Sequence, residues 1–346
     1  MTLHLALAPL RGLTDAAFRG AFAKHFGGFD EALAPFLAPE HGRMPRPKDL
    51  AELVPSNNEA LPTVPQILTD DPALFLATAK LLEQGGCAQV NWNLGCPQPM
   101  IVRRERGAGL LPHPGRISVF LDSVVPSLGM RLSVKLRLGL HDKSEVIPVL
   151  DVLNRYPLHE VIVHPRTGDQ MYKGSADPDA FEEAAPSCRH RLVYNGDICD
   201  VEGFRALHAR FPFVAGWMIG RGAVSEPMLA RMIRGEAVDP RDRLERMHRF
   251  HDAMLEHYLS VLNGPAHVLD KMTGLWGYWV DAIPGKRKPV KRLCKTTELD
   301  RYRRGVEEVF GASGATAGQA AGEDIAQNTT RATTMRYQPK GSRPRR

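Results

Sequence analysis

Cysteine is scarce in this chain, and its few copies are not spaced as metal ligands. The 346 residues contain five cysteines and no Cys-x-x-Cys pair. Closely paired cysteines are typical of zinc sites, and dense cysteine frameworks are typical of small secreted domains. Their absence favours a reducing compartment and argues against a metal site. We therefore expect a cytoplasmic protein without a bound metal.

Long hydrophobic runs are also missing. No apolar segment approaches the roughly 20 residues that a membrane-spanning helix needs, and the first residues carry no signal-peptide pattern. We therefore expect no membrane partner. A Gly-x-Gly-x-x-Gly turn is absent after the first apolar segment, residues 5–9. That absence disfavours an open, doubly wound sheet that binds dinucleotides.

What the chain does contain is a regular alternation of short apolar segments with helical patterns. The strand candidates are residues 5–9, 31–36, 63–68, 89–93, 132–138, 160–164, 192–195 and 214–219. The helix candidates are residues 14–26, 72–84, 116–126, 144–156, 178–185, 201–211 and 225–233. Eight strands alternating with helices match the length of a closed barrel. We predict an α/β fold in which residues 1–235 form a TIM (β/α)8 barrel.

The pattern changes after the barrel. Apolar and aromatic residues recur at helical spacing from Leu244 to Ile283, which predicts a C-terminal helical domain over residues 236–310. Residues 311–346 contain no Leu, Val, Phe or Trp, so they cannot bury enough apolar surface to offset the entropy of ordering. We predict that they form a disordered basic tail.

Positive charge is unevenly distributed along the chain. The formal net charge is +6, and six of the ten residues from 286 to 295 are Lys or Arg, as are six of the last 16. Such clusters are typical of proteins that bind a polyanion. A solvated basic surface followed by a floppy tail would have the same composition.

Polar residues and glycines gather where the predicted strands end. In a (β/α)8 barrel, the loops at the carboxyl ends of the strands build the active site. In chain order, the residues at these ends are Pro9, Leu10, Arg11, Gln66, Asn93, Cys96, Lys135, Arg137, His164, Arg166, Asn195, Gly196, Asp197, Gly220 and Arg221. Each alone is explained by packing or by an ordinary turn. Their joint occurrence at successive strand ends favours one functional site.

Part of this set suits a flavin nucleotide. The turns Asn195-Gly196 and Gly220-Arg221 follow the last two strands, where barrels commonly hold a phosphate on backbone N–H groups. Gln66 and Lys135 suit the polar edge of a flat heterocycle, because a positive charge there stabilises a reduced flavin anion. The sequence therefore predicts bound FMN.

Six motifs, in this order, resemble those of the tRNA-dihydrouridine synthases. They are Ala8-Pro9-Leu10, Asn93-Leu94-Gly95-Cys96-Pro97, Lys135-Leu136-Arg137, His164-Pro165-Arg166-Thr167, Asn195-Gly196-Asp197 and Gly220-Arg221-Gly222. The chain departs from the family at three positions: Leu10 replaces the usual Met, Met100 a frequent Lys or Thr, and Pro165 the usual Gly. Because proline removes an N–H and fixes φ, we expect Pro165 to alter how Arg166 is aimed.

The resemblance implies reduction of a specific uridine in the D-loop of tRNA to 5,6-dihydrouridine. FMN would supply hydride, NADPH would be the electron source, and Cys96 would be the catalytic proton donor, since charge that builds on the ring needs an acid. The implied FMN-binding residues are Pro9, Leu10, Arg11, Gln66, Lys135, His164, Asn195, Gly196, Asp197, Gly220 and Arg221. The implied tRNA-binding residues are Asn93, Arg137, Arg166, Tyr172, Lys271, Lys286, Arg287 and Lys288. We expect a monomer whose helical domain holds the tRNA.

Two other functions fit parts of the sequence. A flavin barrel that acts on a free pyrimidine, like the dihydroorotate or dihydropyrimidine dehydrogenases, would share the strand-end residues. It would need neither the basic run nor the Cys96 motif. A non-catalytic RNA-binding protein would need the helical domain but not the intact set of strand-end residues.

Overall fold

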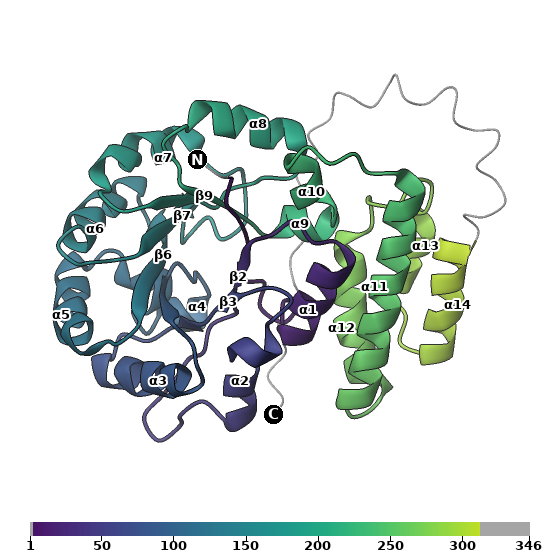
Figure 1. Cartoon of the computed structure of the whole chain (residues 1–346), viewed down its shortest axis with the longest axis horizontal. Helices are drawn as coiled ribbons and strands as arrows, with labels where there is room; N and C mark the ends of the chain where they lie inside the picture. The colour runs from purple at the N-terminus through teal and green to yellow at the C-terminus, as the bar shows by residue number, and fades with distance from the viewer. Residues whose placement is uncertain (1–2, 312–346) are drawn as a thin grey trace. The chain divides into compact units, whose positions relative to one another are not determined.

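The computed structural model describes residues 3–311 of the chain (Figure 1). It divides into two compact units, Met1–Val238 and Asp239–Arg346. No helix in the described part is both long enough and apolar enough to span a membrane. The tail predicted for residues 311–346 lies outside the described residues, except for Gly311.

The first unit is built on one parallel sheet with the strand order β3-β2-β1-β9-β8-β7-β6-β5-β4. The strands are β1 (Leu5–Leu7), β2 (Glu31–Leu33), β3 (Thr63–Val64), β4 (Gln66–Ile67), β5 (Gln89–Leu94), β6 (Arg131–Gly139), β7 (Glu160–Thr167), β8 (Leu192–Tyr194) and β9 (Gly216–Ile219). The two outer strands of this order, β3 and β4, are separated in the chain only by Pro65. One stretch of chain therefore provides both edges, and the sheet closes into the predicted (β/α)8 barrel.

Hydrogen bonds on both sides of this stretch complete the closure. The Ala34 amide, which follows β2, donates to Val64 O at 2.9 Å, and the Asn91 amide of β5 donates to Pro65 O at 2.8 Å. Proline has no N–H to give to the ladder, and that interruption is what divides this barrel strand into β3 and β4.

Helices α3, α5, α6, α7 and α8 ring the sheet in Figure 1. The helices of this unit are α1 (Ala16–His25), α2 (Pro47–Ala51), α3 (Pro72–Gln84), α4 (Pro99–Val102), α5 (Pro114–Val124), α6 (Val146–Leu153), α7 (Pro178–Ala184), α8 (Val201–Arg210), α9 (Arg221–Ser225) and α10 (Leu229–Ile233). Their start signals are visible in the sequence. Asp71, for example, caps α3 by accepting from the amides of Ala73 at 2.8 Å and Leu74 at 3.0 Å.

One expected helix is interrupted. The pattern predicts a continuous helix over residues 225–233, whereas α9 ends at Ser225 and α10 begins at Leu229. Glu226 between them is extended, with φ −122° and ψ 90°. Pro227 follows it, and a residue before proline is pushed out of the helical region.

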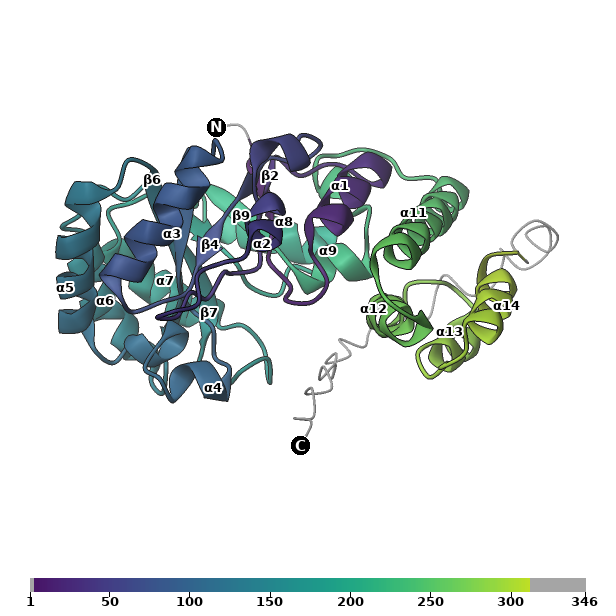
Figure 2. The same cartoon turned by 90° about the horizontal axis from the view of Figure 1, so that it is seen from below.

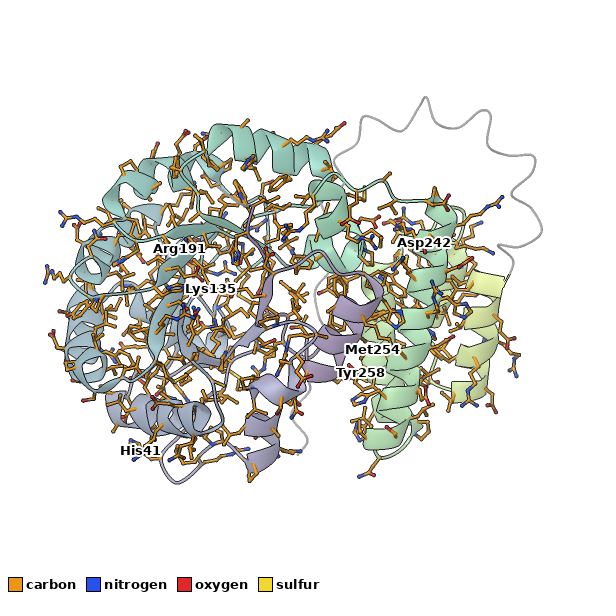
Figure 3. The ribbon with its side chains drawn as sticks, in the orientation of Figure 1. His41, Lys135, Arg191, Asp242, Met254 and Tyr258 are labelled. Atoms are coloured by element: carbon orange, nitrogen blue, oxygen red, sulfur yellow. The ribbon has the colours of Figure 1, made fainter. Side chains whose placement is uncertain are left out.

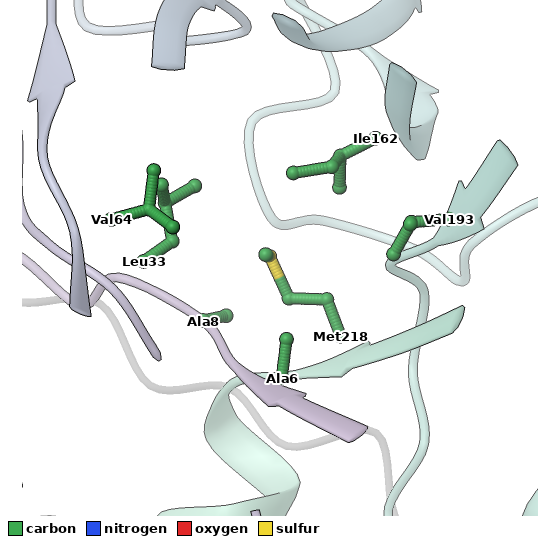
Figure 4. Packing of buried hydrophobic residues seen from close by; sticks show 7 residues of the cluster. All are labelled: Ala6, Ala8, Leu33, Val64, Ile162, Val193 and Met218. Carbon is green, nitrogen blue, oxygen red and sulfur yellow. The ribbon is translucent and has the colours of Figure 1, made fainter. Parts of the chain in front are cut away.

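The interior of the barrel is filled by small and flexible apolar side chains. The cluster shown in Figure 4 consists of Ala6, Ala8, Leu33, Val64, Ile162, Val193 and Met218. Met218 extends into the centre of this cluster (Figure 4). An unbranched thioether fills the irregular space that alanines leave, so the barrel centre is a packed core rather than a channel.

The second unit is helical, as predicted, with α11 (Pro240–Val261), α12 (Pro265–Tyr278), α13 (Arg287–Leu293) and α14 (Leu299–Phe310). Its aromatic residues are buried around one hydroxyl group. Tyr302 OH lies 2.6 Å from His251 Nε2 and accepts from Trp276 Nε1 at 2.7 Å. A buried hydroxyl with both roles satisfied helps to specify a single packing of α11, α12 and α14.

Candidate functional site

The sequence-predicted residues of the first unit lie at the carboxyl ends of the strands, which we call the barrel mouth. Parallel strands place all these ends at the same end of the barrel. Figure 2 shows α4, which follows β5, at this end of the barrel. Lys135 of β6 lies within the ring of strands in Figure 3.

Cys96 lies in a turn, residues 94–97, that two neighbours hold in place; we call it the Cys96 turn. Asn93 Oδ1 accepts from the amides of Gly95 at 3.1 Å and Cys96 at 2.9 Å. On the other side, Cys96 O accepts from the Ala108 amide at 3.0 Å. Gly107 has φ +56°, and a Cβ there would lie 2.7 Å from Cys96 O. Only glycine therefore fits beside this turn without displacing it.

The Cys96 side chain is 9% exposed. Burial raises the pKa of its thiol. The backbone hydrogen bond from Gln98, followed by the positive charges of Arg11, Arg137 and Lys135, opposes this rise only in part. The thiol is therefore protonated at neutral pH. Such a cysteine suits proton donation better than nucleophilic attack, which needs the thiolate.

Behind the turn, a chain of buried amide groups crosses three strands. Asn93 Nδ2 donates to Gln66 Oε1 at 2.7 Å, Gln66 Nε2 to Asn91 Oδ1 at 2.7 Å, and Asn91 Nδ2 to Ser133 Oγ at 2.8 Å. These bonds fix the orientation of Asn93, whose oxygen holds Cys96. The sequence-based reasoning missed Asn91 and Ser133, although two polar residues inside apolar strands were a usable signal.

Basic side chains converge on the mouth from β6, β7 and α9. His164 is buried, and burial together with Arg137, Lys135, Arg166 and Arg221 holds its pKa well below the ordinary value. His164 is therefore neutral. Since an arginine only donates, the contact of 3.0 Å between Arg166 Nη1 and His164 Nε2 makes Nε2 the acceptor and leaves the proton on Nδ1.

Lys135 differs from its neighbours because its ammonium group has no hydrogen bond or ion pair within residues 3–311. Burial, then the nearby Arg137, lower the pKa of Lys135 to about 7. An anion bound beside it would restore the charged form. The amino group of Lys135 is thus available to bind an anionic or hydrogen-bond-accepting ligand.

The carboxylate of Asp197 forms hydrogen bonds with two of these arginines. It accepts from Arg166 Nη1 at 3.0 Å, from Arg221 Nη2 at 2.8 Å and from the Ala176 amide at 2.8 Å. Partial burial favours the protonated form, yet the bonds from Arg166 and Ala176 hold the pKa of Asp197 below its ordinary value. The Asp197 carboxylate therefore orients basic side chains.

Pro165 and Arg166 lie in an irregular part of β7. β7 continues through Pro165 to Thr167 rather than ending at His164. Arg137 pairs with His164 and Gly139 with Thr167, so Leu138 of β6 faces two residues of β7, Pro165 and Arg166. Such a bulge accommodates a residue without an N–H. Arg166, within this bulge, is 1% exposed; whether Pro165 sets its direction stays a prediction.

Tyr172 is the exposed aromatic residue of the mouth. It is 43% exposed, and the guanidinium carbons of Arg137 and Arg221 each lie 5.3 Å from its ring centre. The His164 ring centre is 6.2 Å away. Two cation–π contacts hold the ring while part of it remains accessible.

The glycine turns after β8 and β9 bring backbone close together. Asn195 Nδ2 donates to Met218 O at 2.7 Å, which joins the end of β8 to β9. A Cβ on Gly196 would lie 2.5 Å from Tyr194 OH, and one on Gly220 would lie 3.3 Å from Ala8 Cβ. Glycine at these two positions is what allows the backbone segments to approach this closely.

The residues that follow β1 border the second of these turns. Pro9 comes first, and a Cβ on Gly220 would lie 3.7 Å from Leu10 Cδ2. Arg11 lies 5.3 Å from the Phe36 ring centre. Of the predicted residues at the first strand end, Leu10 therefore lies beside the turn that follows the last strand, and Arg11 contacts the segment that follows β2.

Two observations test whether the mouth fits a flavin nucleotide. Arg166 Nε is buried and has no hydrogen-bond partner within the described part of the chain, and a buried donor of this kind is costly unless a ligand accepts from it. The Lys135 ammonium is likewise unbonded. Basic groups in excess, beside two glycine turns, fit an anionic heterocycle that carries a phosphate.

The basic residues predicted to bind tRNA in the second unit differ in their pairing. Lys271 Nζ lies 5.3 Å from the Tyr258 ring centre, Lys286 Nζ donates to Glu308 O at 2.9 Å, and Arg287 pairs with Asp281 at 3.0 Å. Lys288 forms no ion pair with any residue that the structure describes. No group of His, Cys, Asp and Glu within residues 3–311 is arranged to hold a metal ion.

Comparison with known proteins gives a consistent result. The family model described as dihydrouridine synthase (Dus) matches residues 6–298. The chain is 28% identical over 262 residues to a probable tRNA-dihydrouridine synthase of Rhodobacter capsulatus, covering 74% of this chain and 79% of the relative. It is 31% identical over 243 residues to the tRNA-dihydrouridine(16) synthase of Ralstonia nicotianae, covering 67% and 73%.

Among solved structures, the similarity concerns the fold alone. The old yellow enzyme from Trypanosoma cruzi matches with a TM-score of 0.51 at 10% identity and covers 71% of this chain and 93% of that one. A morphinone reductase variant in complex with tetrahydroNAD matches with a TM-score of 0.51 at 11% identity, covering 69% and 90%.

Proposed function

This chain belongs to the dihydrouridine synthase family, and we propose that it reduces a uridine of tRNA to 5,6-dihydrouridine with FMN bound at the barrel mouth. The observation that carries the proposal is the buried Cys96, in a turn that Asn93 and Gly107 hold in place, near the Lys135 ammonium group. The relatives' names specify tRNA as the molecule that they modify.

The reaction needs a hydride and a proton on the two carbons of one double bond. When bound, FMN supplies the hydride, for which NADPH is the reductant. Cys96 gives the proton to C5 of the uracil ring, where negative charge develops as hydride adds to C6. The raised pKa of Cys96 keeps this proton in place until it is needed.

Other residues of the mouth bind and orient. Lys135, Arg166 and Arg221 offer donors to an anionic cofactor, with Gln66 and His164 beside them and the turns at Asn195-Gly196 and Gly220 for its phosphate. Pro9, Leu10 and Arg11 border the same place from β1. Asn93 and Tyr172 contact the uracil ring, since an accessible aromatic ring is a stacking surface for an unpaired base.

The target uridine lies within folded tRNA and must leave its stack to reach Cys96. We assign the grip on the tRNA backbone to the helical unit, in a monomeric cytoplasmic protein. Lys288, Lys291 and Lys295 form no ion pair with residues 3–311. Their replacement by Gln should flatten the slope of log affinity against log salt by roughly 0.7–0.9 for each phosphate that the protein no longer neutralises. An unchanged slope would make this cluster a solvated surface.

Three functions are separated by one set of assays on the purified protein. The proposal requires a yellow protein that takes up FMN. With NADPH present, this protein must form dihydrouridine in tRNA taken from a strain that lacks the protein. Turnover of free uracil or orotate, but not of tRNA, would instead indicate an enzyme of free pyrimidines. Binding of tRNA without FMN would indicate a non-catalytic RNA-binding protein. Sequencing the modified tRNA gives the position of the uridine.

A further inference from the structure

Arg137 lies at the mouth, and its place in the sequence predicts that it binds tRNA. Its hydrogen-bonding groups are, however, largely occupied within the protein. Its side chain is 1% exposed. Nε donates to Gly95 O at 2.9 Å, and Nη1 donates both to Thr167 O at 2.8 Å and to Met171 O at 2.8 Å. Three of the five N–H groups of this guanidinium are therefore bonded to main-chain carbonyls.

These carbonyls belong to two different segments. Gly95 is part of the Cys96 turn after β5. Thr167 is the last residue of β7, and Met171 lies in residues 168–176, which follow β7 and which we call the Tyr172 loop. Arg137 comes from β6, which lies between β5 and β7 in the sheet. One buried side chain thus joins the segment that carries Cys96 to the segment that carries Tyr172.

The Tyr172 loop needs such support. Met171 has φ +51°, a left-handed conformation that is uncommon for a residue with a side chain. A strained residue persists only where its surroundings determine its conformation. The bond from Arg137 to Met171 O is one such determinant, and the bonds from Arg166 Nη2 to Gly174 O at 2.8 Å and from the Ala176 amide to Asp197 hold the far end of the loop.

We propose that Arg137 is a positioning residue that holds the Cys96 turn and the Tyr172 loop in one fixed arrangement. Its consequence for catalysis rests on the proposed function, in which Cys96 donates a proton to a ring that Tyr172 contacts. A spacing set by one rigid, planar side chain keeps the acid and the stacking surface at a constant separation. This role replaces direct tRNA contact as the main task of Arg137.

Lysine cannot take over this role. A guanidinium presents its donors in a planar fork, whereas an ammonium is a point charge on a flexible stem. Arg137→Lys therefore preserves the positive charge but leaves carbonyls of at least one loop without their donor. The variant separates the effect of positioning from the effect of charge.

Arg19 provides a matched control. It is also 1% exposed, and it donates to Thr14 O at 2.7 Å, to Glu52 O at 2.8 Å and to Asn58 Oδ1 at 2.8 Å. Burial lowers the pKa of Arg19 to about 10, as it does for Arg137. Arg19→Lys thus removes an equivalent set of bonds from a buried arginine on α1.

Hydrogen exchange measured by mass spectrometry on the full chain tests the coupling without reference to any activity. In Arg137→Lys, amides of the Cys96 turn and of the Tyr172 loop should both exchange about tenfold faster or more than in the unmodified protein. Neither segment should change in Arg19→Lys. Faster exchange in only one of the two segments, or in neither, would overturn the proposal.

Kinetics then test the catalytic consequence. Arg137→Lys should leave the flavin spectrum unchanged, lower kcat for tRNA about tenfold and raise KM. Tyr172→Ala should reduce kcat/KM by a smaller factor in the Arg137→Lys protein than in the unmodified protein, because both changes disturb the same loop. Additive losses would overturn positioning through the loop. A wild-type protein that never reduces tRNA would overturn the proposed function instead, and the exchange result would still decide the coupling.

Discussion

The two ends of the barrel carry ionisable side chains in different arrangements. At the amino ends of the strands, which we call the barrel base, His4 and Glu31 lie 3.2 Å apart and Arg234 pairs with Asp30 at 2.7 Å. At the mouth, by contrast, basic groups surround the carboxylate of Asp197. The basic groups of the mouth also bond to main-chain carbonyls and to His164, and the ammonium group of Lys135 has no partner that the structure describes.

The difference indicates that the base contributes to the stability of the fold, whereas the mouth is arranged to bind a ligand. Charges of opposite sign at the base neutralise one another. An excess of buried positive charge at the mouth lowers stability, and it is retained where a ligand makes use of it. In barrels of this kind, the carboxyl ends of the strands carry function and the amino ends carry stability. The comparison makes predictions that separate activity from stability.

The largest effect is expected from two cysteines at opposite ends of β5. Cys96→Ala should reduce dihydrouridine formation by about 10²–10⁴-fold, because a general acid is lost, while FMN uptake stays unchanged. Cys87 precedes β5 and is 5% exposed. Cys87→Ala should leave the rate unchanged and destabilise the fold by about 1 kcal/mol. Rates and urea unfolding of both variants give the answer, and the reverse pattern would contradict the assignment of the two ends.

Lys135 should make FMN binding depend on pH. Because its pKa without a ligand is about 7, Lys135 should take up a proton when FMN, an anion, binds above that pH. Affinity should therefore fall as pH rises from 7 to 9, by up to about tenfold per unit. Lys135→Met should weaken binding by about 10–100-fold at pH 6.5 and abolish this dependence.

Calorimetric titration in two buffers of different ionisation enthalpy measures the proton uptake. Arg191→Met is the control at the base, where Arg191 lies at the start of β8 (Figure 3), and it should change neither quantity. A Lys135→Met protein that binds FMN as the unmodified protein does would remove Lys135 from the cofactor site.

Gly107 should affect activity more than its size suggests. In Gly107→Ala, the new Cβ would lie 2.7 Å from Cys96 O on a backbone with φ +56°, so the Cys96 turn must shift. We expect about a tenfold loss of rate, with destabilisation on the order of 1–3 kcal/mol. A Cβ added at Gly115 of α5 would meet no side chain and no other segment within 4 Å. Gly115→Ala should therefore stabilise slightly and leave the rate unchanged, and equal rates for the two variants would argue against a fixed turn.

The smallest effect concerns the base and appears only in stability. Burial, then repulsion by Glu31, raise the pKa of Glu160 from 4.5 to about 7. The folded state therefore holds a proton that the unfolded state has lost between these pH values. This contribution is complete below pH 4.5 and is lost as pH rises to about 7.

Glu160→Gln should flatten the fall of stability between pH 5 and pH 8. At pH 8 it should be more stable than the unmodified protein by on the order of 1–3 kcal/mol, with activity unchanged. Urea unfolding at several pH values measures this. A variant that is less stable at pH 8 would mean that the Glu160 carboxylate is stabilised by Arg131 and Arg191 at the base.

Much of the barrel follows from local sequence. All eight strand candidates are found where periodicity places them, and the helix capped by Asp71 begins at Pro72, as expected. The mouth follows too, because parallel strands bring their carboxyl ends together whatever the loops do. The break at Pro65 and the bulge at Pro165 were harder to predict from the sequence, since both depend on which strand is paired with the segment.

The roles of individual side chains were the least predictable. Arg137 and Asp197 sit in motifs that suggest ligand contact, yet their partners are carbonyls, amides and arginines from other loops. The packing of Gly107 against Cys96 likewise joins residues of two separate segments. The base cluster of His4, Glu31 and Glu160 had no motif at all, because three distant strand starts contribute one residue each.

Reoxidation of the reduced flavoprotein by tRNA tests the central claim most directly. The protein is reduced anaerobically with NADPH and mixed with tRNA that lacks dihydrouridine, and the flavin absorbance is followed while the tRNA is sampled. The account predicts that tRNA reoxidises the flavin with one dihydrouridine formed per flavin, and that Cys96→Ala does so about 10²–10⁴-fold more slowly. A flavin that stays reduced with tRNA, or that Cys96→Ala reoxidises at the normal rate, would contradict it.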